Sequence, residues 1–192
     1  MSAAVKQPRP VMLPIAERIV EALRPYCERI ELAGSLRRER PLVGDVEIVA
    51  IPRRLRDLFG DPLDGPTLLD SFLDDRGVLF SKRGERYQQF RYGHQTMVDL
   101  FLPTVETWGS VFTIRTGSWE FSRWLVTPQG AGGAAPDGLV FRDGRLWANG
   151  RLLATPEEVD VFHALGLVYI EPAQRHGPIH GAGRIDPVWN YA

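Results

Sequence analysis

The spacing of apolar residues predicts one amphipathic helix near the N-terminus, followed by a series of strands. Leu13, Ile19 and Leu23 belong to a set of apolar positions that recur at roughly helical spacing, which predicts a helix over residues 13–28. Leu68 opens a shorter helical pattern after a Gly- and Pro-rich loop at 60–66. The runs that favour strands lie at residues 30–33, 45–51, 77–81, 86–92 and 95–102.

The pattern changes after residue 103. Residues 104–126 favour helices, interrupted by the Thr-Gly-Ser sequence at 116–118. Asp143-Gly144 joins two short apolar runs, which is a strong hairpin signal. The sequence Thr-Pro-Glu-Glu at 155–158 has the form of a capping box with proline at the first helical position, so we expect a helix to begin there.

These patterns together predict an α+β fold in two parts. We expect residues 1–103 to form a mixed sheet flanked by helices, and residues 104–192 to form a smaller part of helices and a β-hairpin. The tail after Glu171 is rich in Gly and Pro, and we expect it to lie over the surface.

The composition is typical of a soluble globular protein, and neither sign of charge dominates. The net charge is −1, so any binding to a polyanion must come from local patches of basic residues. Cys27 is the single cysteine, which excludes an internal disulfide; it is interpreted as a core residue of the first helix. Neither a signal peptide nor a long apolar run is apparent, so a cytoplasmic protein without a membrane segment is expected. The basic patches are Arg37, Arg38 and Arg40; Arg53, Arg54 and Arg56; and Lys82, Arg83, Arg86 and Arg91.

Acidic residues stand at unusual places in two of the predicted strands. Asp45 and Glu47 are two residues apart and therefore share one face of a strand. Asp99 lies within the apolar sequence "MVDLFL", where a carboxylate needs a partner. If the two strands are neighbours, the three acids converge and form a platform for Mg²⁺. The alternative is that each acid lies at a solvated strand edge.

A possible phosphate-binding turn precedes these acids. Gly34 and Ser35 follow a strand, and the next residues favour a helix, so the free N–H groups of a helix N-terminus could face an anion. Arg38 adds a planar guanidinium that can donate to phosphate oxygens, and Gly44 leaves the backbone directly before Asp45 without a side chain. The alternative is a capped helix with surface arginines.

The sequence "GSLRRERPLVGDVE" resembles the family X DNA polymerases, the DNA polymerase beta group. The longer stretch over residues 13–49 looks especially like the bacterial members. The resemblance continues in "MVDLFL", in "RTGSWEFSRWL" and in "TPEEVDVFHALGLVYIEP", and it extends from about residue 11 to residue 175. It implies a nucleotidyltransferase palm in residues 1–103, followed by a subdomain in residues 104–192 that selects nucleotide and template.

The resemblance also implies roles for individual residues. Asp45 and Glu47 would bridge two Mg²⁺ ions, for which Mn²⁺ would substitute, and Asp99 would ligate one of them. The residues that would bind the nucleotide are Gly34, Ser35, Arg38 and Gly44 at the phosphates, Thr116 and Gly117 at the sugar, and Trp119 and Ser122 elsewhere. Arg123 would contact DNA at the templating base.

Several positions depart from the family pattern. Glu47 stands where the family has Asp, which puts metal geometry and rate in question. Ile114, Arg115 and Val126 replace residues tied to sugar discrimination and accuracy. Neither the family's N-terminal DNA-gripping module nor the bacterial C-terminal phosphoesterase domain is expected in this sequence, so DNA should be held weakly.

The resemblance implies a minimal DNA polymerase that transfers a nucleotide from a dNTP to a DNA 3′-hydroxyl and releases pyrophosphate, in DNA repair or gap filling. Its partners would be a dNTP and a primer–template or gapped DNA, and a protein partner remains open. Two alternatives stay open as well. One is a nucleotidyltransferase with an RNA, protein or small-molecule acceptor, and the other is a catalytically weakened protein that binds nucleotide or DNA.

Overall fold

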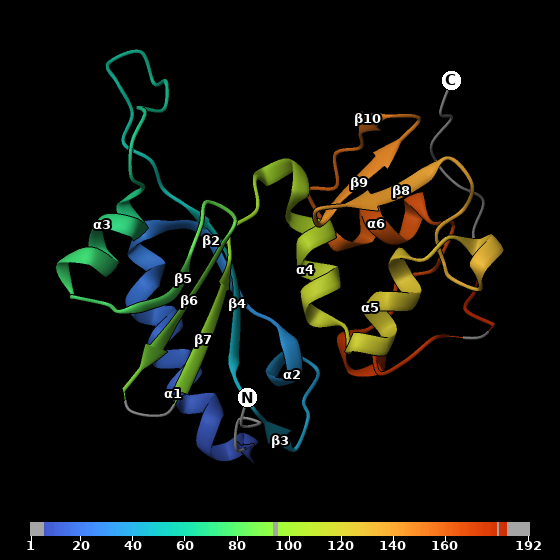
Figure 1. The fold of residues 1–192 in the computed structure, drawn as a ribbon, viewed down its shortest axis with the longest axis horizontal. Coiled ribbons are helices and arrows are strands. Elements are labelled where there is room, and N and C mark those ends of the chain that lie inside the picture. The colour runs from blue at the N-terminus through green and yellow to red at the C-terminus, as the bar shows by residue number, and fades with distance from the viewer. Residues whose placement is uncertain (1–5, 94–95, 180, 184–192) are drawn as a thin grey trace. The chain divides into compact units, whose positions relative to one another are not determined.

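The computed structural model describes residues 6–93, 96–179 and 181–183. The chain divides into two compact units (Figure 1). The first contains Met1–Leu36 and Arg40–Leu102, and the second contains Arg37–Glu39 and Pro103–Ala192. The short segment Arg37–Glu39 thus leaves the first unit and packs within the second.

A mixed sheet forms the centre of the first unit, which confirms the predicted α+β class with helices flanking such a sheet (Figure 1). In the described residues its strand order is β2-β4-β7-β6-β5. Only β4 and β7 are parallel neighbours, and every other pair is antiparallel. The strands are β2 Cys27–Leu32, β4 Val46–Pro52, β5 Phe80–Arg83, β6 Tyr87–Tyr92 and β7 Thr96–Phe101. Gln95, which was predicted in the last strand, lies outside the described residues.

Two helices, α1 Arg9–Leu23 and α3 Leu68–Asp75, cover one face of this sheet. The core on that face takes alternate residues of the central strands. Since side chains alternate along a strand, the residues between them point to the other face. The core residues from β4 and β7 are Val46, Ile48, Ala50, Val98 and Leu100.

The predicted short helix is confirmed as α3, which begins after the N-cap residue Thr67. The prediction for the first helix is wrong at both ends. Helix α1 begins at Arg9 and stops at Leu23, and a 3-10 turn, η1 Arg24–Tyr26, separates it from β2. Pro25 explains the early end, because proline cannot donate the next helical hydrogen bond.

Cys27 therefore lies in β2 and not in a helix, but its interpretation as a core residue is confirmed. Burial raises the pKa of this free thiol to about 12, although Arg53 and Arg24 act in the opposite direction. The thiol is therefore protonated at neutral pH.

The helix predicted after Ser35 is a single turn, α2 Gly34–Arg37. Glu39 then adopts a positive φ of 57°, and Pro41 follows, so the helix cannot continue. The chain returns through β3 Leu42–Val43, which pairs with β1 Gln7–Pro8.

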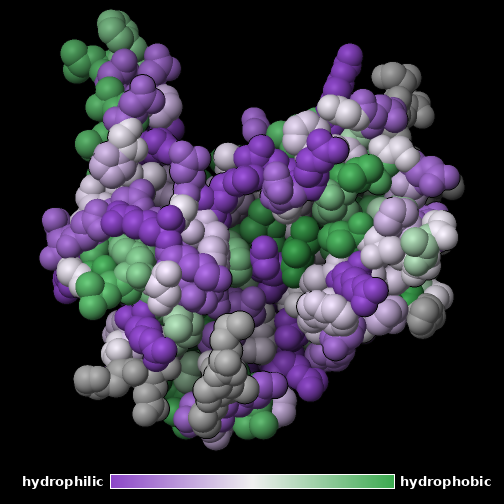
Figure 2. Space-filling view, in the orientation of Figure 1, coloured by the Kyte–Doolittle hydropathy of each residue, from purple (hydrophilic) through white to green (hydrophobic). Residues whose placement is uncertain are grey.

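The predicted loop at 60–66 is part of a longer projecting segment between β4 and α3 (Figure 1). An isolated bridge joins Arg56 to Pro62. The side chains of Leu58 and Phe59 at its turn are 100% and 91% exposed, and Figure 2 shows hydrophobic surface at the end of this segment.

In the second unit, the predicted helices are confirmed as α4 Trp108–Thr116 and α5 Trp119–Val126. The break falls at Gly117-Ser118, where the Ser118 hydroxyl accepts a hydrogen bond from the Phe121 N–H at 3.1 Å and caps α5. The 3-10 helices of this unit are η2 Val105–Thr107, η3 Gln129–Ala131 and η4 Pro172–Gln174.

The predicted hairpin is confirmed as β8 Leu139–Arg142 and β9 Arg145–Ala148. Asp143 and Gly144 at its turn have φ values of 53° and 75°, as a two-residue hairpin turn of this kind requires. A further short strand, β10 Arg151–Leu152, extends the sheet and was not predicted.

The last helix, α6 Glu158–Ala164, starts later than the capping pattern predicted. Thr155 does not cap it, because its hydroxyl bonds that of Ser110 at 2.6 Å. Glu157 stands at the N-cap position instead, and its N–H donates to Asp160 at 2.8 Å. Of the tail after Glu171, the structure describes residues 172–179 and 181–183. These residues are largely exposed or partly exposed, but Arg175 among them is completely buried.

Among the described residues, no helix combines the length and the hydropathy that crossing a bilayer requires.

Candidate active site

Two of the three predicted metal-ligating carboxylates are register partners on the sheet face opposite the core of α1 and α3. Glu47 of β4 lies beside Asp99 of β7 in the parallel pair, and both residues point away from the core packed by α1 and α3. Neighbouring strands in a sheet lie about 4.8 Å apart. Asp45 precedes β4 by one residue. All three residues are partly exposed.

The Asp99 carboxylate is held through one of its oxygens. Asp99 Oδ1 accepts hydrogen bonds from the Tyr87 hydroxyl and from Gln89 Nε2, the second at 2.8 Å. Both donors come from β6, in which Gln89 is the antiparallel partner of Asp99. Asp99 Oδ2 receives no hydrogen bond from the described residues.

The Glu47 carboxylate lies against Gly34. A Cβ atom added to Gly34 would stand 1.7 Å from Glu47 Oε2, and Gly34 has a φ of +59°. Glycine suits this place, because it adopts this φ readily and leaves room for the carboxylate where it lies. The Ala33 N–H also donates to the Glu47 carbonyl at 2.8 Å, which fixes the turn against β4.

The two carboxylates therefore lie toward opposite sides of the β4–β7 pair. Glu47 packs against the turn that follows β2, whereas Asp99 is bonded from β6, and these strands flank the β4–β7 pair on its two sides. Within the part of the chain that the structure describes, no group of three or more His, Cys, Asp or Glu side chains is placed to hold a metal ion.

The turn itself carries a polar group that could meet a ligand. Ser35 Oγ is buried and has no hydrogen-bond partner among the described residues. Gly44 is partly buried and leads directly into Asp45. The helix predicted to present its N-terminus here is the single turn α2, and the use of this turn for phosphate binding stays a prediction.

The residues predicted to contact the sugar and the base lie in the second unit, as does Arg38 from the predicted phosphate set, and several of them serve its internal structure. Arg38 donates to the Thr116 carbonyl at 2.5 Å, and Ser122 donates to the Ile114 carbonyl at 2.6 Å. A Cβ on Gly117 would meet the side chains of Phe121 and Ser122 at 2.4 and 2.6 Å, so the break between α4 and α5 needs a glycine.

Trp119 and Arg123 form an exposed pair on α5. The Trp119 side chain is 70% exposed, and the Arg123 guanidinium lies 5.2 Å from the centre of its ring. An exposed aromatic ring beside a guanidinium can stack on a base and contact a phosphate.

A buried ionic cluster in the second unit was not predicted. Glu158 is 6% exposed and accepts hydrogen bonds from Arg37 at 2.6 and 2.9 Å, from Arg175 at 2.6 Å and from the Tyr169 hydroxyl at 3.1 Å. Burial raises the pKa of Glu158, but the hydrogen bonds from Arg37 and Arg175 outweigh this effect and hold it below its usual value. The Arg37 guanidinium also lies 3.8 Å from the centre of the Phe112 ring.

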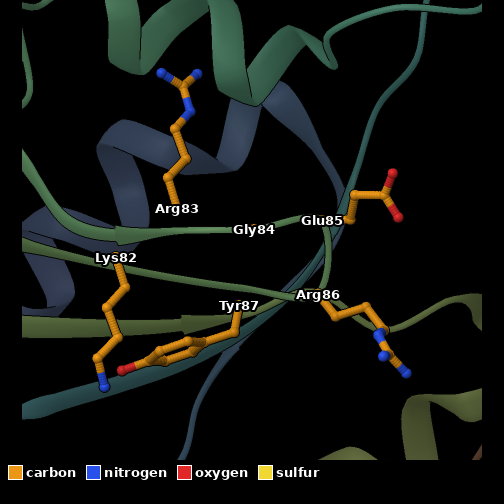
Figure 3. A pocket seen from close by; sticks show the side chains of 6 residues that line it. All are labelled: Lys82, Arg83, Gly84, Glu85, Arg86 and Tyr87. Carbon is orange, nitrogen blue, oxygen red and sulfur yellow. The ribbon is translucent and has the colours of Figure 1, made fainter.

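An open hollow of about 450 Å³ lies at the β5–β6 hairpin of the first unit (Figure 3). Lys82 runs along one side of Tyr87, with its ammonium 5.6 Å from the ring centre, whereas Arg83 points the other way and pairs with Asp74 at 2.7 and 2.8 Å. Through Tyr87, the hollow adjoins Asp99. It is lined by Lys82, Arg83, Gly84, Glu85, Arg86 and Tyr87.

Comparison with known families relates the second unit to a DNA polymerase. Residues 112–176, from within α4 to just beyond η4, match the family described as the DNA polymerase beta thumb. No curated protein matches the chain. The matched region contains the exposed Trp119–Arg123 pair and, from the ionic cluster, Glu158, Tyr169 and Arg175. Arg37, Glu47 and Asp99 lie outside it.

Proposed function

We propose that this protein is a polymerase beta-like nucleotidyltransferase. It transfers a nucleotide from a dNTP to the 3′-hydroxyl of a primer or a gap in DNA and releases pyrophosphate, in DNA repair or gap filling. The observation that carries the proposal is the polymerase beta thumb match over residues 112–176. The register pairing of Glu47 with Asp99 in the other unit supports it, because nucleotidyl transfer needs carboxylates for divalent cations.

The carboxylates on the sheet face opposite the core fit Mg²⁺ in their donor chemistry, although the described residues are not gathered into a three-ligand site. Carboxylate oxygens are the ligands that Mg²⁺ prefers, and Asp99 Oδ2 has no hydrogen bond from the described residues. Asp99, Glu47 and Asp45 would hold the ions, for which Mn²⁺ would substitute. A cation shared by Glu47 and Asp99 requires the Glu47 carboxylate to turn away from Gly34.

The bound ions would lower the pKa of the attacking hydroxyl and neutralise charge on the phosphates. The protein's own groups position the reactants. The Ser35 hydroxyl would donate to a phosphate oxygen, since it lies buried without a partner in the described residues. Trp119 and Arg123 would contact the nucleotide and the DNA from the thumb-like unit.

Primer extension tests the proposal directly. The purified protein is incubated with labelled primer on recessed, gapped and single-stranded DNA, with dNTPs or rNTPs and with Mg²⁺ or Mn²⁺; RNA primers are included to test another acceptor. Incorporation should require a divalent ion and should fall about 1,000-fold in Asp99→Asn. Folded protein that incorporates nothing with any acceptor or metal would overturn the proposal.

A second candidate is a protein that binds nucleotide or DNA without turnover. It is favoured by the placement of the carboxylates, since the described residues contain no three-ligand group. Binding of labelled dNTP or gapped DNA that persists in Asp99→Asn, without any incorporation by the wild-type protein, would select this candidate.

A further inference from the structure

The hydrogen bonds of Asp99 divide its two oxygens into different roles. Oδ1 accepts from both Tyr87 and Gln89, and a carboxylate oxygen with two such donors has its lone pairs engaged. Oδ2 has no donor within the described residues. We propose that Tyr87 and Gln89 are positioning residues that restrict Asp99 to cation binding through Oδ2 alone and thereby favour Mg²⁺ over Ca²⁺. This inference rests on the metal-binding part of the proposed function.

Both donors are held firmly in place. Gln89 is the direct register partner of Asp99 in the β6–β7 ladder, so its backbone cannot shift without breaking the sheet. The Tyr87 ring stacks on Phe101 with ring centres 5.1 Å apart, and the Lys82 ammonium lies over the ring (Figure 3). Oδ1 is therefore bonded by groups whose positions are fixed independently of any ligand.

Both donors are also neutral, which preserves the negative charge of Asp99. A paired guanidinium would neutralise the carboxylate, as happens to Glu158 in the other unit. Hydrogen bonds from a hydroxyl and an amide orient the group but leave its net charge available to a cation. The arrangement suits a metal ligand better than a structural ion pair.

One-oxygen ligation discriminates between cations by coordination geometry. Mg²⁺ requires near-octahedral geometry at about 2.0–2.1 Å and usually takes one oxygen from each carboxylate, with waters completing the shell. Ca²⁺ takes about 6–8 oxygens at longer distances and readily uses both oxygens of one carboxylate. For Asp99, two-oxygen ligation would require loss of the hydrogen bonds from Tyr87 and Gln89.

The test measures cation binding to the full chain without nucleotide or DNA. Tyr87→Phe removes the hydroxyl and keeps the ring, and Gln89→Leu removes the amide. Tyr92→Phe is the matched control, because it makes the same change on the same strand at a side chain that is 43% exposed. Calorimetric titration with Mg²⁺ and, separately, with Ca²⁺ gives the ratio of the two affinities for each variant, and circular dichroism verifies folding.

The ratio of Mg²⁺ to Ca²⁺ affinity should fall by about 10-fold in Tyr87→Phe and in Gln89→Leu, because losing a group that orients a metal ligand typically lowers affinity for the matched ion by about 10- to 100-fold. It should stay unchanged in Tyr92→Phe. Folded Tyr87→Phe and Gln89→Leu with the wild-type ratio would overturn the inference, and so would a wild-type chain that binds neither ion.

The outcomes also separate this inference from the proposed function. If the wild-type chain extends primers but the affinity ratio does not change in the variants, the proposed function stands and the positioning role is wrong. If the affinity ratio falls in the variants as expected but the wild-type chain extends no primer on any acceptor, the positioning role stands and the proposed reaction is wrong.

Discussion

Asp99 and Glu158 are both acidic residues with several hydrogen-bond donors, but the two units treat them differently. Asp99 is partly exposed on a sheet face, and its donors Tyr87 and Gln89 are neutral. Glu158 is buried, and two of its donors are the guanidinium groups of Arg37 and Arg175.

The difference indicates which carboxylate can serve a ligand. Two arginines more than balance the charge of Glu158, so this cluster is a closed structural centre that secures Arg37–Glu39 within the second unit. Neutral donors fix Asp99 and leave its charge uncompensated, which suits a cation site. The type of donor therefore distinguishes a structural acid from a candidate catalytic one more clearly than burial alone.

The largest expected effect is on activity, from Asp99→Asn. Asparagine keeps the shape of the side chain, and its oxygen can accept from Tyr87, but it removes the charge that a metal ion needs. Loss of one metal ligand removes several kcal/mol of transition-state stabilisation, so primer extension should fall about 1,000-fold. Single-turnover extension in Mg²⁺ measures this effect.

Asp75→Asn is the control, since this exposed acid at the end of α3 should have no part in the reaction. Free energies of unfolding should stay within about 1 kcal/mol of wild type for both variants. Wild-type extension rates in Asp99→Asn would show that the comparison assigns the wrong role to this residue.

The next effect is on stability, from Glu158→Ala. The substitution leaves the buried guanidinium of Arg175 and the partly buried guanidinium of Arg37 without their counter-ion, and breaking a buried pair in this way costs about 3–5 kcal/mol. Urea unfolding monitored by tryptophan fluorescence measures the loss. Asp137→Ala removes an exposed carboxylate in the same unit and should change the unfolding free energy by less than about 0.5 kcal/mol.

The strands of the first unit could be predicted because alternation and apolar runs are local signals. The same alternation shows that Glu47 and Asp99 each lie on the face of its own strand that is opposite the apolar core residues. Their register depends on which strands become neighbours, and the sequence does not encode that locally. For this reason the contacts of Tyr87 and Gln89 with Asp99 could not be predicted. Both residues lie in a predicted strand, but only the β6–β7 pairing brings them to Asp99.

The Glu158 cluster could not be predicted from spacing. Its three charged members come from the α2 turn, from α6 and from the tail, and no pattern joins residues so far apart in the sequence. Thr155 was assigned to a cap because the local motif favours it, but its bond to Ser110 shows a tertiary contact overriding that preference. Gly34 was predicted to admit a phosphate, and the structure shows the Glu47 carboxylate in contact with it.

A third, smaller effect comes from Gly34→Ala on the carboxylate face. The new Cβ would lie 1.7 Å from Glu47 Oε2, and alanine disfavours the positive φ, so the unfolding free energy should fall by about 2 kcal/mol. Gly60→Ala is a matched control, because Gly60 also has a positive φ but no atom lies within 4 Å of an added Cβ. It should lose about 1 kcal/mol, from backbone strain alone.

A double-mutant cycle separates the two contributions at Gly34. If the clash with the Glu47 carboxylate matters, Gly34→Ala should cost less in a Glu47→Ala background, where that carboxylate is gone. Equal costs in both backgrounds would mean that backbone strain accounts for the whole effect and that Glu47 does not depend on the glycine.

The smallest expected effect is the pH dependence of the Glu158 cluster. The pKa of Glu158 in the folded chain lies below the ordinary 4.5, because the hydrogen bonds from Arg37 and Arg175 outweigh its desolvation. A carboxylate with a lowered pKa binds fewer protons in the folded state, so its stabilising contribution is complete above about pH 4.5 and is lost as the pH falls through the folded pKa. Glu158→Gln lacks this titration, and the other acids titrate in both proteins. The difference in unfolding free energy between wild type and Glu158→Gln should therefore be constant from pH 7 to pH 5 and shrink in more acidic buffer. A difference that stays constant down to pH 3 would show that the two arginines do not stabilise the charged form of Glu158.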